Sequence, residues 1–168
     1  RVTLIGKRIY MCYTAFDAIG PPRIALTSIK VSDFLKRNWK WEKPILISEP
    51  GVDNKDGCIL SKKINGKYVF FHRIGNSICI NLVSDLNFGK DRWLGSNCFL
   101  IKPRPDKWDN RKIGISAPPI ETKDGWLLLY HGVSDPGGIY KLGAIIFKHD
   151  DPIQITTRTN CTILEPKM

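Results

Sequence analysis

The stretch Ile64-Asn65-Gly66-Lys67-Tyr68-Val69-Phe70-Phe71-His72 decides the fold class, because a turn signal runs directly into an aromatic strand. Asn-Gly favours a tight hairpin turn whose two central residues have positive φ. Aromatic and β-branched residues such as those of 68–71 are typical of strands. Similar combinations occur at 5–15 and 122–131, whereas apolar residues at helical spacing persist for no more than a turn or two. The sequence therefore predicts an all-β fold.

The turn glycines mark a repeat, since Gly6, Gly66 and Gly125 lie 60 and 59 residues apart. Each is followed by an aromatic-rich strand, a polar loop and a second strand, expected at 23–27, 77–83 and 139–147. A repeat of this length with about four short strands suits a β-propeller blade. A single β-sandwich whose hairpins look alike is the alternative.

We therefore predict a single partial β-propeller domain over 1–168. Its approximate blade units are 1–60, 61–120 and 121–168. About three blades leave the ring incomplete, because propellers typically have four to eight.

Composition sets the broad class. The chain has 168 residues, 42% of them hydrophobic, which is enough for one domain with a sizeable core and excludes disorder, collagen and coiled coil. The formal net charge of +10 favours anionic partners such as phosphate or a sugar phosphate. The apolar runs are strand-sized, far below the roughly 18 to 20 residues of a membrane helix, so we expect no membrane span.

The cysteines indicate neither a metal site nor a disulfide framework. They are widely spaced, with no C-x-x-C pair and no histidine at zinc spacing. We expect reduced, mostly buried thiols at Cys12, Cys58, Cys79, Cys98 and Cys161. No signal peptide is visible from Arg1 onward.

Candidate functional side chains follow the central strands, where propeller loops converge. A bound oxyanion favours a guanidinium, an ammonium and an imidazole directed at one point, and Arg73, Lys112 and His131 provide those three groups. If the substrate is a sugar, cleavage of its glycosidic bond also needs a carboxyl proton donor. Asp17, Asp56 and Asp109 each lie in a loop beside a strand, although most loop aspartates only cap turns.

Ten segments resemble, in order and across nearly the whole chain, the β-mannoside phosphorylases of glycoside hydrolase family 130. They are Tyr13-Thr14-Ala15-Phe16-Asp17, Pro22-Arg23-Ile24-Ala25-Leu26, Lys55-Asp56, Lys63-Ile64-Asn65-Gly66-Lys67-Tyr68, His72-Arg73, Trp108-Asp109, Lys112-Ile113-Gly114, Pro118-Pro119-Ile120, Gly125-Trp126-Leu127-Leu128-Leu129-Tyr130-His131-Gly132-Val133 and Tyr140-Lys141-Leu142-Gly143-Ala144. The resemblance implies a five-bladed propeller with an axial active site. It also implies inverting phosphorolysis that releases α-mannose 1-phosphate, although some lineages hydrolyse instead.

By this resemblance Arg73, Lys112 and His131 bind phosphate, which is the co-substrate, and no cofactor or metal is needed. The expected substrate-side residues are Lys55, Asp56, Asp109, Tyr140 and Asp17. Lys55 and Asp56 stand where many phosphorylases of the family have an Arg-Asn pair. The family's general acid is an Asp two residues before an Arg that resembles Arg1, so we expect the acid upstream and this fragment alone to be inactive.

Two other functions stay open. An inverting β-mannoside hydrolase would need a second carboxylate to activate water. A carbohydrate-binding or nucleic-acid-binding propeller module would use exposed aromatics among basic residues, as at 36–41, but we favour packing of Trp39 and Trp41 against a blade edge.

The expected partners are a β-mannoside oligosaccharide and phosphate, without nucleic acid or membrane. The resemblance suggests a cytoplasmic location, and homo-oligomerisation is left open.

Overall fold

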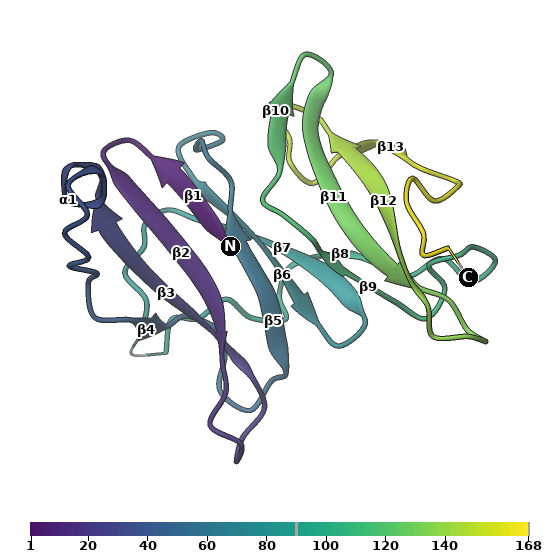
Figure 1. Cartoon of the computed structure of the whole chain (residues 1–168), viewed down its shortest axis with the longest axis horizontal. Helices are drawn as coiled ribbons and strands as arrows, with labels where there is room; N and C mark the ends of the chain where they lie inside the picture. Colours follow the sequence, from purple (N-terminus) through teal and green to yellow (C-terminus); the bar gives the residue numbers. More distant parts are fainter. Residues whose placement is uncertain (90, 168) are drawn as a thin grey trace.

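Three antiparallel sheets follow one another along the chain in this computed structural model, which describes residues 1–89 and 91–167 (Figure 1). The first sheet has the order β1-β2-β3-β4. Its strands are β1 (Val2–Ile5), β2 (Arg8–Ala15), β3 (Arg23–Lys30) and β4 (Ile45–Leu46). A short helix, α1 (Val31–Leu35), follows β3.

The second sheet repeats this arrangement with the order β5-β6-β7-β8, and the third differs in having a fifth strand. The strands of the second sheet are β5 (Asn54–Ile59), β6 (Tyr68–Ile74), β7 (Ser77–Val83) and β8 (Phe99–Ile101). Those of the third are β9 (Lys112–Ile115), β10 (Ile120–Thr122), β11 (Gly125–Val133), β12 (Tyr140–Phe147) and β13 (Ile155–Arg158). β9 and β10 pair successively with the same edge of β11.

All three turn glycines have positive φ, but only the Asn65-Gly66 turn has positive φ at both central residues, as the sequence predicts. Gly6, Gly66 and Gly125 have φ values of 58°, 76° and 136°. Asn65, the residue before Gly66, also has a positive φ of 49°, as a type I′ turn requires. These turns fix the hairpin registers, including Ile5 opposite Arg8 and Thr122 opposite Gly125.

The core lies between the sheets, and the second sheet is buried on both faces. Successive side chains of a strand point to opposite faces. Phe70 accordingly packs with Ile24 and Ile59 in the cluster between the first two sheets, whereas Phe71 packs with Phe147 in the cluster between the second and third. This double burial explains why Val69, Phe70 and Phe71 are apolar in succession, where a strand buried on one face would alternate.

The first strand of each sheet lies toward a common centre, where β5 contacts both β1 and β9. The turns after β2, β6 and β11 lie at the same end of the molecule, the lower edge of Figure 1. The prediction of an all-β chain built from propeller blades in an incomplete ring is confirmed. This topology brings the ends of β5, β6, β9 and β11 together.

The prediction of reduced thiols is wrong for Cys79 and Cys98. The structure joins them in a disulfide with a Cα–Cα distance of 5.8 Å. The bridge links β7 to the segment just before β8, and β7–β8 pairing brings these two segments together. Spacing along the chain gave no sign of the pair. Cys12 and Cys58 are free and buried, and Cys161 is free and exposed. In the described residues no helix is long and apolar enough to cross a membrane.

Candidate active site

A β-bulge in β5 positions the central carboxylate of the site. The pairing of β5 with β6 shifts register between Lys55 and Cys58, and Asp56 within the bulge has a φ of 58°. Asp tolerates this left-handed conformation better than most residues, and bulges re-aim side chains beside active sites. The adjacent Gly57 is needed as well, since a Cβ there would lie 2.7 Å from the Ile24 side chain.

Asp56 joins basic side chains from different sheets. Its Oδ2 accepts a hydrogen bond from Arg73 Nε at 2.7 Å, and its Oδ1 accepts one from an Arg1 Nη at 3.2 Å. The Nε2 atom of His131 lies 4.0 Å from Oδ2. Arg73 is held by a further bond, from Nη1 to the Gly75 carbonyl at 2.7 Å. Three blades therefore meet at one carboxylate.

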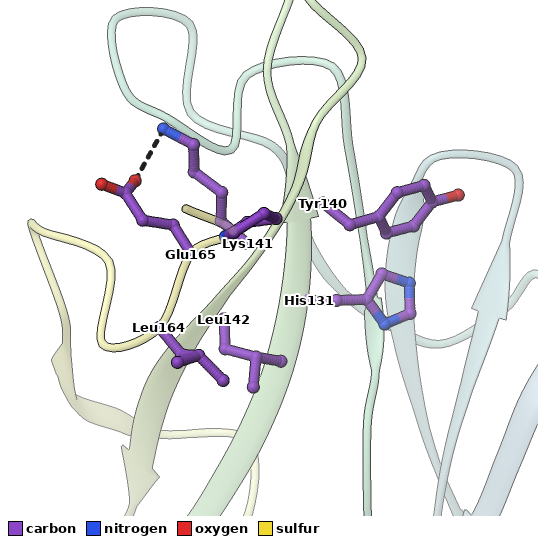
Figure 2. A pocket seen from close by; sticks show the side chains of 7 residues that line it. His131, Tyr140, Lys141, Leu142, Leu164 and Glu165 are labelled. Carbon is purple, nitrogen blue, oxygen red and sulfur yellow. Dashed lines mark ion pairs between the residues drawn. The ribbon is translucent and has the colours of Figure 1, made fainter. Parts of the chain in front are cut away.

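Lys112 and Tyr140 extend this group on the third sheet. The Lys112 ammonium donates a hydrogen bond to the Tyr140 hydroxyl at 2.7 Å. The rings of His131 and Tyr140 are 5.5 Å apart between centroids, and Figure 2 shows them side by side. We call the three cations Arg1, Arg73 and Lys112, together with the neighbouring His131 imidazole, the cationic cluster. It brings together the three predicted phosphate ligands, with Asp56 and Tyr140 beside them.

Gly114 allows this close approach. It lies on β9 directly opposite His131 on β11. A Cβ at Gly114 would lie 2.5 Å from His131 Nε2 and 2.7 Å from Asp56 Oδ2. Real Cβ contacts of that length do not occur, so any side chain at this position would push the imidazole and the carboxylate apart.

The cluster sets the protonation of its own members. Burial lowers the pKa of His131, and the neighbouring cations lower it further against the pull of Asp56. Burial alone would raise the pKa of Asp56, but the hydrogen bond and charge of Arg73, with the other cations, hold it below its ordinary value. At neutral pH the imidazole is therefore neutral and the carboxylate ionised.

A cavity of about 380 Å³ opens beside His131 and Tyr140. Its floor is apolar, with Leu142 and Leu164 in the view of Figure 2. The rim carries an ion pair between Lys141 and Glu165, with an N–O distance of 2.9 Å. The space borders the cationic cluster directly, because its lining includes His131, a member of the cluster, and Tyr140, which accepts a hydrogen bond from Lys112.

Asp109 lies outside the cationic cluster. Its side chain is 0% exposed, and its Oδ1 accepts from Arg104 while Oδ2 accepts from Arg158 and the Tyr130 hydroxyl. Burial would raise the pKa of Asp109, but these bonds hold it below its ordinary value. We therefore assign Asp109 a structural role in place of the predicted sugar contact, since it joins the segment before β9 to β13 and exposes no surface to a ligand.

Two other predicted residues lie outside the cluster. Asp17, at the tip of the hairpin between β2 and β3, accepts hydrogen bonds from the backbone N–H groups of Ile19 and Gly20, each at 3.0 Å. Lys55 forms an ion pair with Asp53 at 3.2 Å. The sugar contacts of both residues stay predictions.

Sequence reasoning missed two members of the site. The sequence assigns Arg1 no role, but its guanidinium contacts Asp56 and donates to the Ile115 carbonyl. For Gly114 the sequence shows only its place in the Lys112-Ile113-Gly114 motif. A glycine two residues after a candidate phosphate ligand in the same strand is a usable signal, because glycine within a strand often marks a close approach of other groups. Among the described residues no group of three or more metal-ligating side chains occurs.

Successive antiparallel sheets around a shared centre, with basic side chains gathered where their first strands meet, define part of a β-propeller that carries a site suited to an oxyanion. The chain belongs to glycoside hydrolase family 130, whose model, described as beta-1,4-mannooligosaccharide phosphorylase, matches residues 1–168. The family resemblance read from the sequence is confirmed.

Known relatives agree with this assignment. A beta-1,2-mannobiose phosphorylase of Thermoanaerobacter sp. is 38% identical over 100% of this chain and 52% of its own length. The solved structure of the Listeria innocua beta-1,2-mannobiose phosphorylase with beta-1,2-mannobiose is 34% identical, with a TM-score of 0.77 over 100% of this chain and 45% of that one. A glycosyl hydrolase of Bacteroides ovatus, 22% identical, shares the fold with a TM-score of 0.75, over 100% and 52% of the two chains. The chain spans about half the length of the curated relatives it matches.

Proposed function

We propose that this chain supplies the phosphate site of a β-mannoside phosphorylase. The enzyme would cleave a β-mannoside oligosaccharide with inversion to give α-mannose 1-phosphate. The observation that carries the proposal is the convergence of Arg73, Lys112 and His131, from three different strands, on Asp56 and Tyr140. A cytoplasmic location is part of the proposal, because phosphorolysis keeps the bond energy in a sugar phosphate that metabolism inside the cell can use.

The cluster suits the demands of this reaction. Phosphate is a weak nucleophile, so the site must concentrate it and place one oxygen in line with the anomeric carbon. Arg73 supplies a planar fork and Lys112 a mobile ammonium. His131, being neutral, donates through one ring N–H. The phosphate oxygen forms the new bond to the anomeric carbon as the glycosidic bond breaks on the opposite face.

The leaving oxygen must receive a proton, and Asp56 is unsuited to give it. A general acid at neutral pH needs a raised pKa, whereas the cations lower that of Asp56. Asp109 is buried and fully bonded. We therefore propose that the acid comes from the position that the family places two residues before Arg1.

Product analysis tests the proposal. The reading frame that contains this chain is expressed and incubated with β-1,2-linked or β-1,4-linked mannobiose, with and without inorganic phosphate. We expect α-mannose 1-phosphate, seen by phosphorus and proton NMR, only when phosphate is present. Free mannose formed at the same rate without phosphate would contradict the proposal and support an inverting hydrolase, for which Asp56 would be the candidate base.

A further inference from the structure

Asp56 places a negative charge inside a cluster proposed to bind an anion. Its side chain is 18% exposed and lies against Arg73, Arg1 and His131. No ligand that is itself an anion gains from an ionised carboxylate beside it unless a proton lies between the two. Binding therefore depends on whether the anion carries a proton as well as on its charge.

The carboxylate retains room to accept a hydrogen bond from a ligand. Two carboxylate oxygens offer about four acceptor positions. Arg73 uses one on Oδ2 and Arg1 uses one on Oδ1. His131 Nε2, at 4.0 Å, is beyond hydrogen-bond distance. An oxyanion that bridges Arg73 and His131 comes close to Asp56 Oδ2, because Arg73 Nε lies 2.7 Å and His131 Nε2 lies 4.0 Å from that oxygen.

Oxyanions differ in whether they can donate to this oxygen. Phosphate and arsenate carry at least one proton at neutral pH, whereas sulfate carries none. A hydroxyl of hydrogen phosphate can donate a short, charge-assisted bond to a carboxylate. Sulfate presents acceptors only and is repelled. We propose that Asp56 makes the cationic cluster selective for oxyanions that carry a proton, so that the cluster takes hydrogen phosphate and rejects sulfate.

The surroundings prevent Asp56 from turning away. Its backbone is fixed in the bulge, where Gly57 packs against Ile24. Arg73 is anchored at both ends of its guanidinium, by Asp56 and by the Gly75 carbonyl. The lowered pKa of Asp56 keeps the carboxylate ionised, and thus an acceptor only, at neutral pH. The inference rests on the proposed function in that phosphate is the anion taken to bind here.

Calorimetric titration of the chain at pH 7 with phosphate, arsenate and sulfate tests the proposal. In the wild type we expect phosphate and arsenate to bind at least roughly tenfold more tightly than sulfate, since one charge-assisted bond is gained and one repulsion avoided. In Asp56→Asn the side-chain amide can donate to sulfate, so we expect the preference to fall close to one.

Asp53→Asn is the matched control, because it removes the same charge three positions away, from a carboxylate that pairs with Lys55 outside the cluster. It should keep the wild-type preference. Equal binding of phosphate and sulfate by the wild type, or an unchanged preference in Asp56→Asn, would overturn the proposal. So would a failure of all three anions to bind.

If Asp56→Asn does not fold, the arsenate and sulfate titrations of the wild type still show whether the cluster prefers an oxyanion that carries a proton. The anion ratio is also independent of catalysis. A protein that releases mannose 1-phosphate but binds sulfate as well as phosphate would retain the proposed function and lose this inference.

Discussion

Replacement of Arg73 by alanine should raise the phosphate requirement at least a hundredfold. Two of the five N–H groups of Arg73 are already used, by Asp56 and by the Gly75 carbonyl. The remaining donors can give an oxyanion two charge-assisted bonds, each contributing about 1.5 to 3 kcal/mol. Loss of about 3 kcal/mol corresponds to roughly a hundredfold in affinity. Arg73→Lys retains the charge but not the fork, so we expect an intermediate loss.

The assay is the phosphate dissociation constant from calorimetry, together with the phosphate dependence of product formation. Removal of one partner of a largely buried ion pair also costs stability, about 3 kcal/mol, so urea unfolding must show that the variant is folded under assay conditions. Arg92→Ala is the matched control, because Arg92 pairs with Asp85 in an exposed position. A folded Arg73→Ala chain with unchanged phosphate affinity would refute the reasoning.

Substitutions at Asp109, Lys112 and Gly114 test three other contacts of the structure. Asp109→Asn should lower the free energy of unfolding by about 3 to 5 kcal/mol, because it breaks a buried ion cluster, and an unmoved urea midpoint would contradict this. Since the folded pKa of Asp109 lies below its ordinary 3.8, this stability is complete above that pH and is lost as the pH falls below it, so the difference should shrink in acid. Lys112→Met should raise the pKa of Tyr140, whose hydroxyl now accepts the Lys112 hydrogen bond, and ultraviolet titration of tyrosinate would show no shift if the contact were absent. Gly114→Ala should abolish phosphate binding, whereas Gly20→Ala, with open space around its Cβ, should not; equal affinities in the two variants would exclude the close packing.

Much of the fold could be predicted because its signals are local. The conformation at Gly6, Gly66 and Gly125 depends on each residue and its neighbour, and the strands that follow are marked by their own residue types. The disulfide between Cys79 and Cys98 is different, because it depends on the pairing of β7 with β8. A pairing between strands is a tertiary property, and single residues carry little sign of it.

The site residues also divide into those that local sequence predicts and those that depend on tertiary contacts. Arg73, Lys112 and His131 could be proposed together because each lies near the end of a strand and the repeat places strand ends at one centre. Asp109 has the same kind of local sequence, yet its side chain turns into the core and meets Arg104 and Arg158. Whether an aspartate beside a strand is buried or faces the axis depends on partners far along the chain. The bulge at Asp56 is likewise invisible until β5 is paired with β6.

The direct test of the central claim is a crystal structure of the chain with arsenate, which stands in for phosphate and whose arsenic atom is located by anomalous scattering. The account predicts one arsenic peak within hydrogen-bonding reach of Arg73, Lys112 and His131, with an arsenate oxygen facing Asp56. An arsenic peak bound elsewhere, with these three side chains making no contact to it, would contradict the account.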